Sequence, residues 1–121
     1  MHYQNEDMIQ NKILFLPTSK GIERIAVDNI VRVEALSNYS KLFFTDGKTL
    51  VVAKLLHWFE DNLVAGRFAR VHRSHLININ YIQKYNTKGD QLILLKDNSF
   101  VEVSRRKRAA LKKLLQNTLA A

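Results

Sequence analysis

Cysteine is absent from the 121-residue sequence, and glycine and proline are scarce, with four residues and one residue. Without a thiol, the chain forms no disulfide and offers no thiolate to a metal or to nucleophilic catalysis. The sequence also lacks a hydrophobic run long enough to span a bilayer. Its first residues have neither the basic start nor the apolar centre of a signal peptide. These absences predict a soluble, cytoplasmic protein with no membrane partner and no flexible linker between domains.

Positive charge exceeds negative charge, and the excess is concentrated near the end of the sequence. Lysine and arginine total 19 residues against 11 aspartate and glutamate residues, a net charge of +8. The segment from Ser104 to Ala121 contains six of these cations and no acid. Hydrophobic residues make up 46% of the chain, a normal share for a globular domain. This surplus in a small domain favours a polyanionic partner.

Short alternating segments indicate a mainly β fold. In Ile30–Leu36, Val31 and Val33 fall on one side of the predicted strand, and Arg32 and Glu34 fall on the other. The predicted strands are residues 12–17, 22–27, 30–36, 39–45, 48–52, 67–71, 76–85, 91–95 and 99–103, with hairpin turns at Asp46-Gly47 and Asp97-Asn98.

Two segments have the apolar periodicity of helices. The first covers residues 53–65 and precedes Gly66, which suits a left-handed cap. Its apolar face consists of Leu55, Leu56, Phe59 and Leu63. The second follows Ser104, a favourable N-cap residue. Its apolar stripe consists of Leu111, Leu114, Leu115, Thr118 and Leu119.

These elements predict one domain with a compact, multi-stranded antiparallel β fold, one internal helix and one C-terminal helix. The domain spans residues 12–121. Residues 1–11 are polar and are expected to form a flexible leader or a linker stub.

The start of the last helix has an unusual charge. Arg105, Arg106, Lys107 and Arg108 place four cations where the partial positive charge of a helix N-terminus favours anions. A phosphate-rich partner would relieve this conflict and use the free backbone N–H groups. The alternative is a solvated basic face.

A polar run, His72-Arg73-Ser74-His75, interrupts two apolar runs. Arg73 can donate two parallel hydrogen bonds to guanine, and His72 and Ser74 can donate to a phosphate or a base edge. Further along, Asn78 and Asn80 are expected to have a structural role in capping the turn or pairing buried backbone groups.

The segment Ser37–Lys41 is a polar loop between two predicted strands. Serine and asparagine favour β-turns, which is the structural interpretation. The functional interpretation is that Ser40 and Lys41 face a DNA groove. For Tyr39, base stacking and burial in the core remain equal alternatives.

Metal binding and catalysis are the rival interpretations of the histidines. His72 and His75 could meet on one metal, but zinc needs three or four ligands, and the carboxylates are distant in sequence. Ser74 lies near His72, yet neighbours on a strand face apart and no orienting acid is visible. A glycine-rich phosphate loop is also missing. The sequence therefore predicts a protein that is not an enzyme and has no catalytic residue, metal or cofactor.

Several of these segments, in this order, resemble the LytTR family of DNA-binding domains, which are found mostly at the C-terminus of bacterial response regulators. The resemblance covers about residues 12–117. It rests on Val33-Glu34-Ala35-Leu36-Ser37-Asn38-Tyr39, Asp46-Gly47, Lys54-Leu55-Leu56, Phe68-Ala-Arg-Val-His-Arg-Ser74, Ile77-Asn78, Ile82 and Val103-Ser104-Arg105-Arg106.

The resemblance implies a LytTR-type fold whose loops, rather than a recognition helix, enter successive grooves of double-stranded DNA, often at direct repeats. It implies transcription regulation in a bacterial two-component system. By position, the implied contacts come from Ser40 and Lys41, from Arg73 with His72 and Ser74, and from Arg106. Arg105 matches the arginine of the family's Val-Ser-Arg motif, and the resemblance implies that it either contacts phosphate or braces the fold.

The sequence departs from the family pattern in three respects. The family often has proline where Glu102 stands and an aromatic residue where His75 stands. No receiver domain is present in this chain, so an excised effector domain and a stand-alone regulator both remain open, as does a homodimer on DNA.

Two other functions remain as alternatives. An RNA or single-stranded nucleic-acid module would need exposed aromatic residues, whereas Phe43, Phe44, Trp58, Phe59 and Phe68 lie in apolar patterns. A membrane-surface or protein-interaction domain would use the basic, amphipathic last helix, but the fold needs that apolar stripe to cover a sheet.

Overall fold

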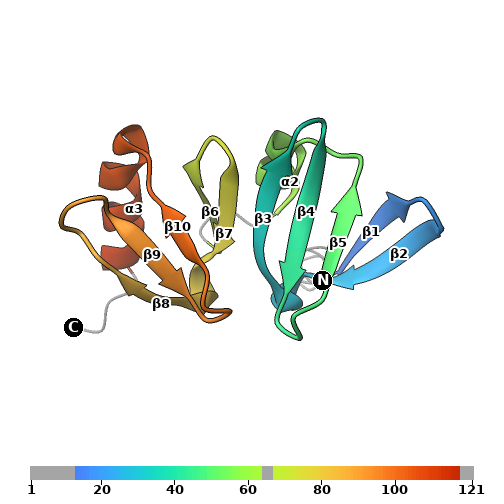
Figure 1. Ribbon diagram of the computed structural model, residues 1–121, viewed down its shortest axis with the longest axis horizontal. Coiled ribbons are helices and arrows are strands. Elements are labelled where there is room, and N and C mark those ends of the chain that lie inside the picture. Colours follow the sequence, from blue (N-terminus) through green and yellow to red (C-terminus); the bar gives the residue numbers. More distant parts are fainter. Residues whose placement is uncertain (1–12, 64–66, 118–121) are drawn as a thin grey trace, which may run out of the picture.

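The computed structural model describes residues 13–63 and 67–117, which form three antiparallel sheets, two α-helices and three short 3₁₀ helices (Figure 1). The strands are β1 (Ile13–Thr18), β2 (Gly21–Ala26), β3 (Ile30–Leu36), β4 (Tyr39–Phe44), β5 (Thr49–Val52), β6 (Phe68–His72), β7 (His75–Asn78), β8 (Ile82–Tyr85), β9 (Leu92–Leu95) and β10 (Phe100–Glu102). The helices are α2 (Leu56–Asn62), α3 (Arg108–Gln116), η1 (Val27–Asn29), η2 (Ile79–Tyr81) and η3 (Arg105–Lys107). The predicted mainly β fold is confirmed.

A five-stranded sheet in the order β5-β4-β3-β7-β6 forms the centre of the molecule. The β1-β2 hairpin stands at one end and the three-stranded sheet β10-β9-β8 at the other (Figure 1). The predicted turn at Asp46-Gly47 joins β4 to β5, and the Asp46 carboxylate accepts a hydrogen bond from the Lys48 amide at 2.9 Å. Gly47 has a φ of +86°, a value that glycine adopts without strain.

The predicted continuous strand over residues 76–85 is wrong, because η2 divides it into β7 and β8. Asn78 causes the break. Its buried side chain donates to the Ile30 carbonyl at 2.9 Å and accepts from the Asn80 amide at 3.0 Å, which turns the chain into η2. The structural role predicted for Asn78 is confirmed. The break carries the chain from the central sheet into the three-stranded sheet.

Two hydrophobic cores lie on opposite faces of the central sheet. Alternation along β7 places Leu76 in the first core, which includes residues of α2, and Ile77 in the second core, which includes Leu111 of α3. The prediction that Val31 and Val33 share a face is wrong: Val33 belongs to the first core and Val31 to the second. The strand register shifts between Ile30 and Arg32, so a bulge reverses the alternation there.

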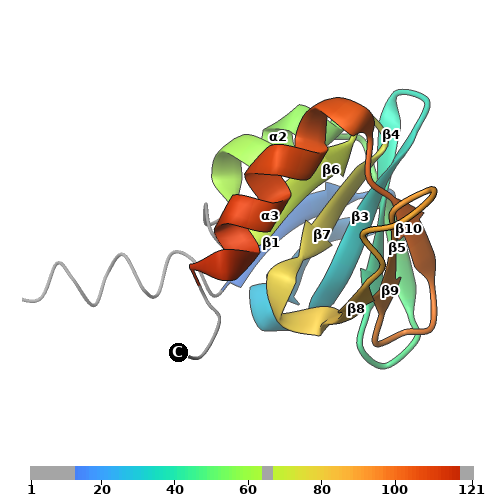
Figure 2. The same ribbon diagram turned by 90° about the vertical axis from the view of Figure 1, so that its left-hand side faces the viewer.

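Helices α2 and α3 flank the edge strand β6 (Figure 2). Leu56, Phe59 and Leu63 are buried as predicted, whereas Leu55 is 44% exposed because its extended backbone precedes the helix. Leu111 anchors α3 and is buried. The predictions for Gly66, Thr118 and Leu119 fall outside the residues that the structure describes.

Candidate nucleic-acid interface

Three loops that are distant in sequence line one edge of the molecule, at the top of Figure 1: the β3–β4 turn, the β6–β7 turn and the start of η3. The β6–β7 turn lies between the other two. The Ala35 amide donates to the Ser74 carbonyl at 2.9 Å, and the Ser104 amide donates to the Val71 carbonyl at 2.8 Å. The fold therefore joins the three regions that the sequence singled out, and this row is called the loop edge below.

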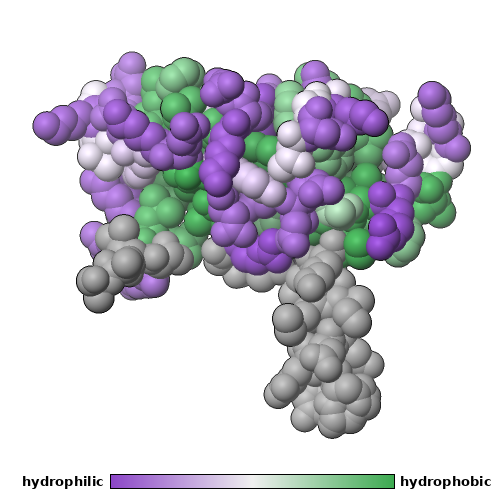
Figure 3. All heavy atoms as spheres, turned by 90° about the horizontal axis from the view of Figure 1, so that it is seen from below, coloured by the Kyte–Doolittle hydropathy of each residue, from purple (hydrophilic) through white to green (hydrophobic). Residues whose placement is uncertain are grey.

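The opposite edge, at the bottom of Figure 1, has a different charge pattern. It holds η1 and the β4–β5 and β9–β10 turns, each of which contains an aspartate: Asp28, Asp46 and Asp97. Seen from below, hydrophilic and hydrophobic side chains alternate over this face (Figure 3). Asp28 pairs with Arg67 and Asp97 with Arg32, whereas the three loops of the loop edge contain no acid.

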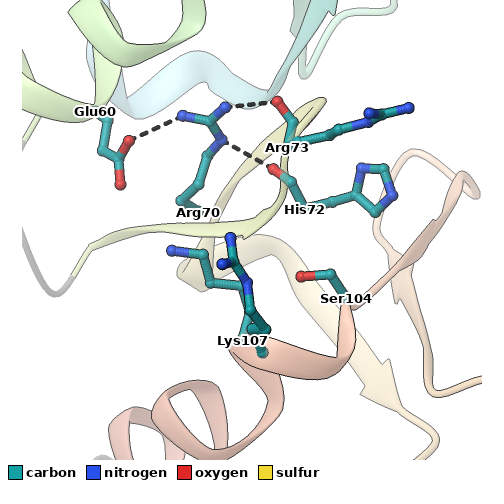
Figure 4. A pocket seen from close by; sticks show the side chains of 7 residues that line it. Glu60, Arg70, His72, Arg73, Ser104 and Lys107 are labelled. Atoms are coloured by element: carbon teal, nitrogen blue, oxygen red, sulfur yellow. Dashed lines mark hydrogen bonds and ion pairs between the residues drawn. The ribbon is translucent and has the colours of Figure 1, made fainter.

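Side-chain hydrogen bonds fix the shape of the β6–β7 turn (Figure 4). Arg70 donates to the His72 carbonyl at 2.8 Å and to the Arg73 carbonyl at 2.5 Å. The Ser74 amide donates to Nδ1 of His72 at 3.1 Å, which leaves Nε2 as the ring nitrogen that can contact a ligand. The Arg73 side chain is exposed, and among residues 13–63 and 67–117 it has no hydrogen bond or ion pair. A fixed backbone therefore carries a free guanidinium.

His75 faces His72 across the base of this turn, with ring centroids 5.3 Å apart. Burial lowers the pKa of His75, and although Glu34 opposes this effect, His72 and Arg32 add to it. Nδ1 of His75 is buried and has no hydrogen-bond partner among the residues that the structure describes. Within the described parts of the chain, no group of three or more histidine, cysteine, aspartate or glutamate side chains could hold a metal ion.

The cations before α3 form a short 3₁₀ turn rather than the first turn of the α-helix. The predicted capping role of the Ser104 side chain is wrong, because this side chain makes no cap hydrogen bond. Instead, the Ser104 carbonyl accepts a hydrogen bond from the Lys107 amide at 2.9 Å. Arg105 and Arg106 are exposed, and Lys107 is half-buried. Arg108 differs from them, since its Nε donates to the Val103 carbonyl at 3.2 Å.

At the β3–β4 turn, the structure corrects the prediction for Ser40. Ser40 is fully buried in β4, and its hydroxyl donates to the Lys54 carbonyl at 2.7 Å, so it is not available to contact DNA. Lys41 also lies in β4 rather than in the loop, and its ammonium stands 5.2 Å from the centroid of the Phe43 ring. The turn itself contains Ser37, with a φ of +57°, and the adjoining Tyr39 is 49% exposed.

A pocket of about 400 Å³ opens between the β6–β7 turn and η3 (Figure 4). Its walls bring together four of the predicted site residues, His72, Arg73, Arg106 and Lys107, with Ser104 beside them. The sequence analysis missed the two other lining residues, Arg70 and Glu60. Neither residue has a signal of its own in the sequence, because its role depends on contacts that only the fold creates. Four formal cations against one carboxylate give the pocket an excess of positive charge, which favours an anionic group over a cationic one.

Comparison with known proteins bears on the family and the fold of the chain. The family described as LytTr DNA-binding domain matches residues 20–116. A solved structure from Bacillus cereus, described as the LytTr DNA-binding domain of a methyl-accepting/DNA response regulator, superposes with a TM-score of 0.75 at 24% identity. The match covers 86% of this chain and 96% of that one, and it supports the fold. No curated protein matches the chain.

Proposed function

The chain belongs to the LytTR family of DNA-binding domains, and from that premise we propose that its loop edge binds double-stranded DNA with sequence specificity and thereby regulates transcription. The observation that carries the proposal is the row of three acid-free loops, with exposed arginines at the second and third. The three loops project from the same edge of the molecule and are expected to enter successive grooves.

The exposed Arg73 side chain is the proposed base-recognition group. A guanidinium can donate two parallel hydrogen bonds to O6 and N7 of guanine in the major groove. It makes no hydrogen bond or ion pair with the described residues, so none of their contacts must break when it binds. His72 and Ser74 are assigned to positioning, through contacts with phosphate or with the turn itself.

The cations around η3 are the proposed phosphate-binding groups. Arg106 and Lys107 line the pocket beside the turn, and Arg105 is exposed next to them. A backbone phosphate in this pocket would meet cations from both loops. Arg108 is assigned the smaller role of bracing the turn through the Val103 carbonyl, and Lys41 a contact at the flank of the first loop.

The biological setting is inferred from the family. We infer that the domain serves in the bacterial cytoplasm as the effector half of a two-component response regulator or as a stand-alone regulator. Direct-repeat sites would seat two copies, as a homodimer or as separate domains, and a receiver domain on another part of the protein would control their pairing. No helix in the described part of the chain is long and apolar enough to cross a membrane.

Single-stranded nucleic acid is the alternative ligand. Base stacking would need a platform of exposed aromatic side chains. Among the described residues, Tyr39 is exposed at the loop edge, whereas the exposed Phe15 and Phe100 lie on β1 and β10. A single exposed ring does not form a stacking platform for successive bases, and this favours the duplex over a single strand as the ligand.

Selection of bound sequences from a random duplex library tests the proposal. The expected result is an enriched motif repeated in the same orientation at a fixed spacing. The selected duplex, its separated strands and the matching RNA then compete for the protein in an anisotropy titration. Enrichment of no motif, or tighter binding of a single strand, would overturn the proposal.

A further inference from the structure

Among the described arginines beside the candidate interface, Arg70 alone uses all three guanidinium nitrogens in hydrogen bonds to the protein itself. It makes three hydrogen bonds: to the His72 carbonyl at 2.8 Å, to the Arg73 carbonyl at 2.5 Å and to Glu60 at 2.9 Å (Figure 4). Its side chain is only 18% exposed, and the Glu60 carboxylate offsets its charge. These contacts leave it little capacity to bind a phosphate.

The two carbonyls that Arg70 holds belong to the residues where the strand ladder ends. Pairing between β6 and β7 shifts register between Arg70 and His72, and the turn follows directly. Buried or half-buried carbonyls outside a ladder need another donor. The planar guanidinium supplies two N–H groups in a rigid fork, a geometry that a lysine ammonium does not reproduce.

Glu60 extends this bracing from the turn to a helix. It lies in α2, whose Phe59 is buried in the first core, so the carboxylate projects from an anchored element. In Figure 4, Glu60 and Arg70 lie on one side of the turn, and the Arg73 side chain extends away from them. The chain of contacts runs from α2 through Arg70 to the backbone of Arg73.

We propose that Arg70, oriented by Glu60, is a positioning residue that fixes the backbone of the β6–β7 turn and thereby sets the direction in which Arg73 meets a base. The proposal rests on the proposed function for its DNA part. Holding the turn in the bound shape before binding lowers the entropy lost on association. Arg70 therefore acts on sequence discrimination rather than on charge attraction.

The experiment compares Arg70→Ala, Arg70→Lys and Glu60→Gln with the matched control Arg67→Ala. Arg67 precedes the same strand and also pairs with a carboxylate, that of Asp28, but at the end of β6 away from the turn. Its loss removes one cation and one ion pair without touching the turn. The readouts are discrimination between the selected duplex and a duplex altered at the base pair that Arg73 recognises, the salt dependence, and amide exchange in the free protein.

We expect Arg70→Ala to lower discrimination at that base pair about tenfold, the effect of losing hydrogen bonds made by a charged group. The salt slope of Arg70→Ala should match that of Arg67→Ala. In the double variant with Arg73→Ala, Arg70→Ala should cause no further loss of discrimination. Arg70→Lys should not restore discrimination, and Glu60→Gln should lower it less. A salt slope shallower than the control by about 0.9 would instead assign Arg70 a phosphate contact and overturn the proposal. Discrimination in Arg70→Ala equal to that of the wild type would also overturn the proposal.

Amide exchange separates this proposal from the proposed function, because it needs no DNA. The Ser74 and Ala35 amides, which donate to His72 Nδ1 and to the Ser74 carbonyl, should exchange about tenfold faster in Arg70→Ala and unchanged in Arg67→Ala. Unchanged exchange at both amides overturns the positioning role. A wild-type protein without any duplex preference overturns the proposed function alone. If Arg70→Ala fails to fold, Arg70→Lys and Glu60→Gln decide the same question.

Discussion

The β6–β7 turn and the η3 turn both present cations at the loop edge, but they hold them in different ways. In the first, two hydrogen bonds donated by Arg70 and one accepted by Nδ1 of His72 fix the backbone on either side of Arg73. In the second, Ser104 provides no side-chain cap, and Arg105 and Arg106 are exposed. The fixed turn suits recognition of a base, which requires direction. The η3 turn suits attraction of phosphate, which requires only charge.

The largest effect should come from removing the η3 cations. The triple variant Arg105→Ala/Arg106→Ala/Lys107→Ala should bind all duplexes about a hundredfold more weakly at 0.1 M salt, because three phosphate contacts disappear. The log–log salt slope should become shallower by about 2.7, at about 0.9 per contact. Anisotropy titrations over a salt series measure both quantities. Discrimination between selected and altered duplexes should persist. Its loss would show that η3 also recognises bases and would remove the contrast between the turns.

A smaller and more selective effect is expected from Arg73→Ala. Loss of a bidentate contact to guanine should weaken binding of the selected duplex by about 1 to 3 kcal/mol. Binding to duplexes altered at that base pair should change little, so discrimination falls at one position. Competition titrations with a panel of single-base-pair variants measure this pattern. An equal loss on every duplex would assign Arg73 a phosphate contact instead.

Sequence patterns predicted the local elements well, because alternation and turn residues act over a few neighbours. Most strands and the Asp46-Gly47 hairpin follow from such signals. The failures involve contacts across the fold. Asn78 breaks the predicted strand through a bond to Ile30, which lies far back in the chain. The bulge in β3 likewise depends on its pairing with β4.

The same distinction between local signals and contacts across the fold applies to the candidate site. His72, Arg73 and the η3 cations could be predicted from the sequence, because their residue types alone suggest binding to an anion or a base. The burial of Ser40 could not, since its hydroxyl pairs with the Lys54 carbonyl on a distant segment. Nor could the pairing of Glu60 with Arg70, which requires α2 to pack beside β6. Side chains that position others have no signature of their own in the sequence.

A change of pH gives the smallest effect and distinguishes the two turns once more, since the β6–β7 turn is flanked by His72 and His75 and the η3 turn contains no histidine. Burial holds the pKa of His75 below its usual value of about 6.5. The unfolded chain therefore binds more protons than the folded chain just below that pH, so the free energy of unfolding falls as pH drops through 6.5 toward the folded pKa. Urea unfolding at pH 7.5, 6.5 and 5.5 should show this decline in the wild type. In His75→Phe, which keeps an aromatic ring without a titrating group, the decline should be smaller. Parallel pH profiles for the two proteins would mean that His75 titrates alike in the folded and unfolded states, and that the base of the turn is open to water.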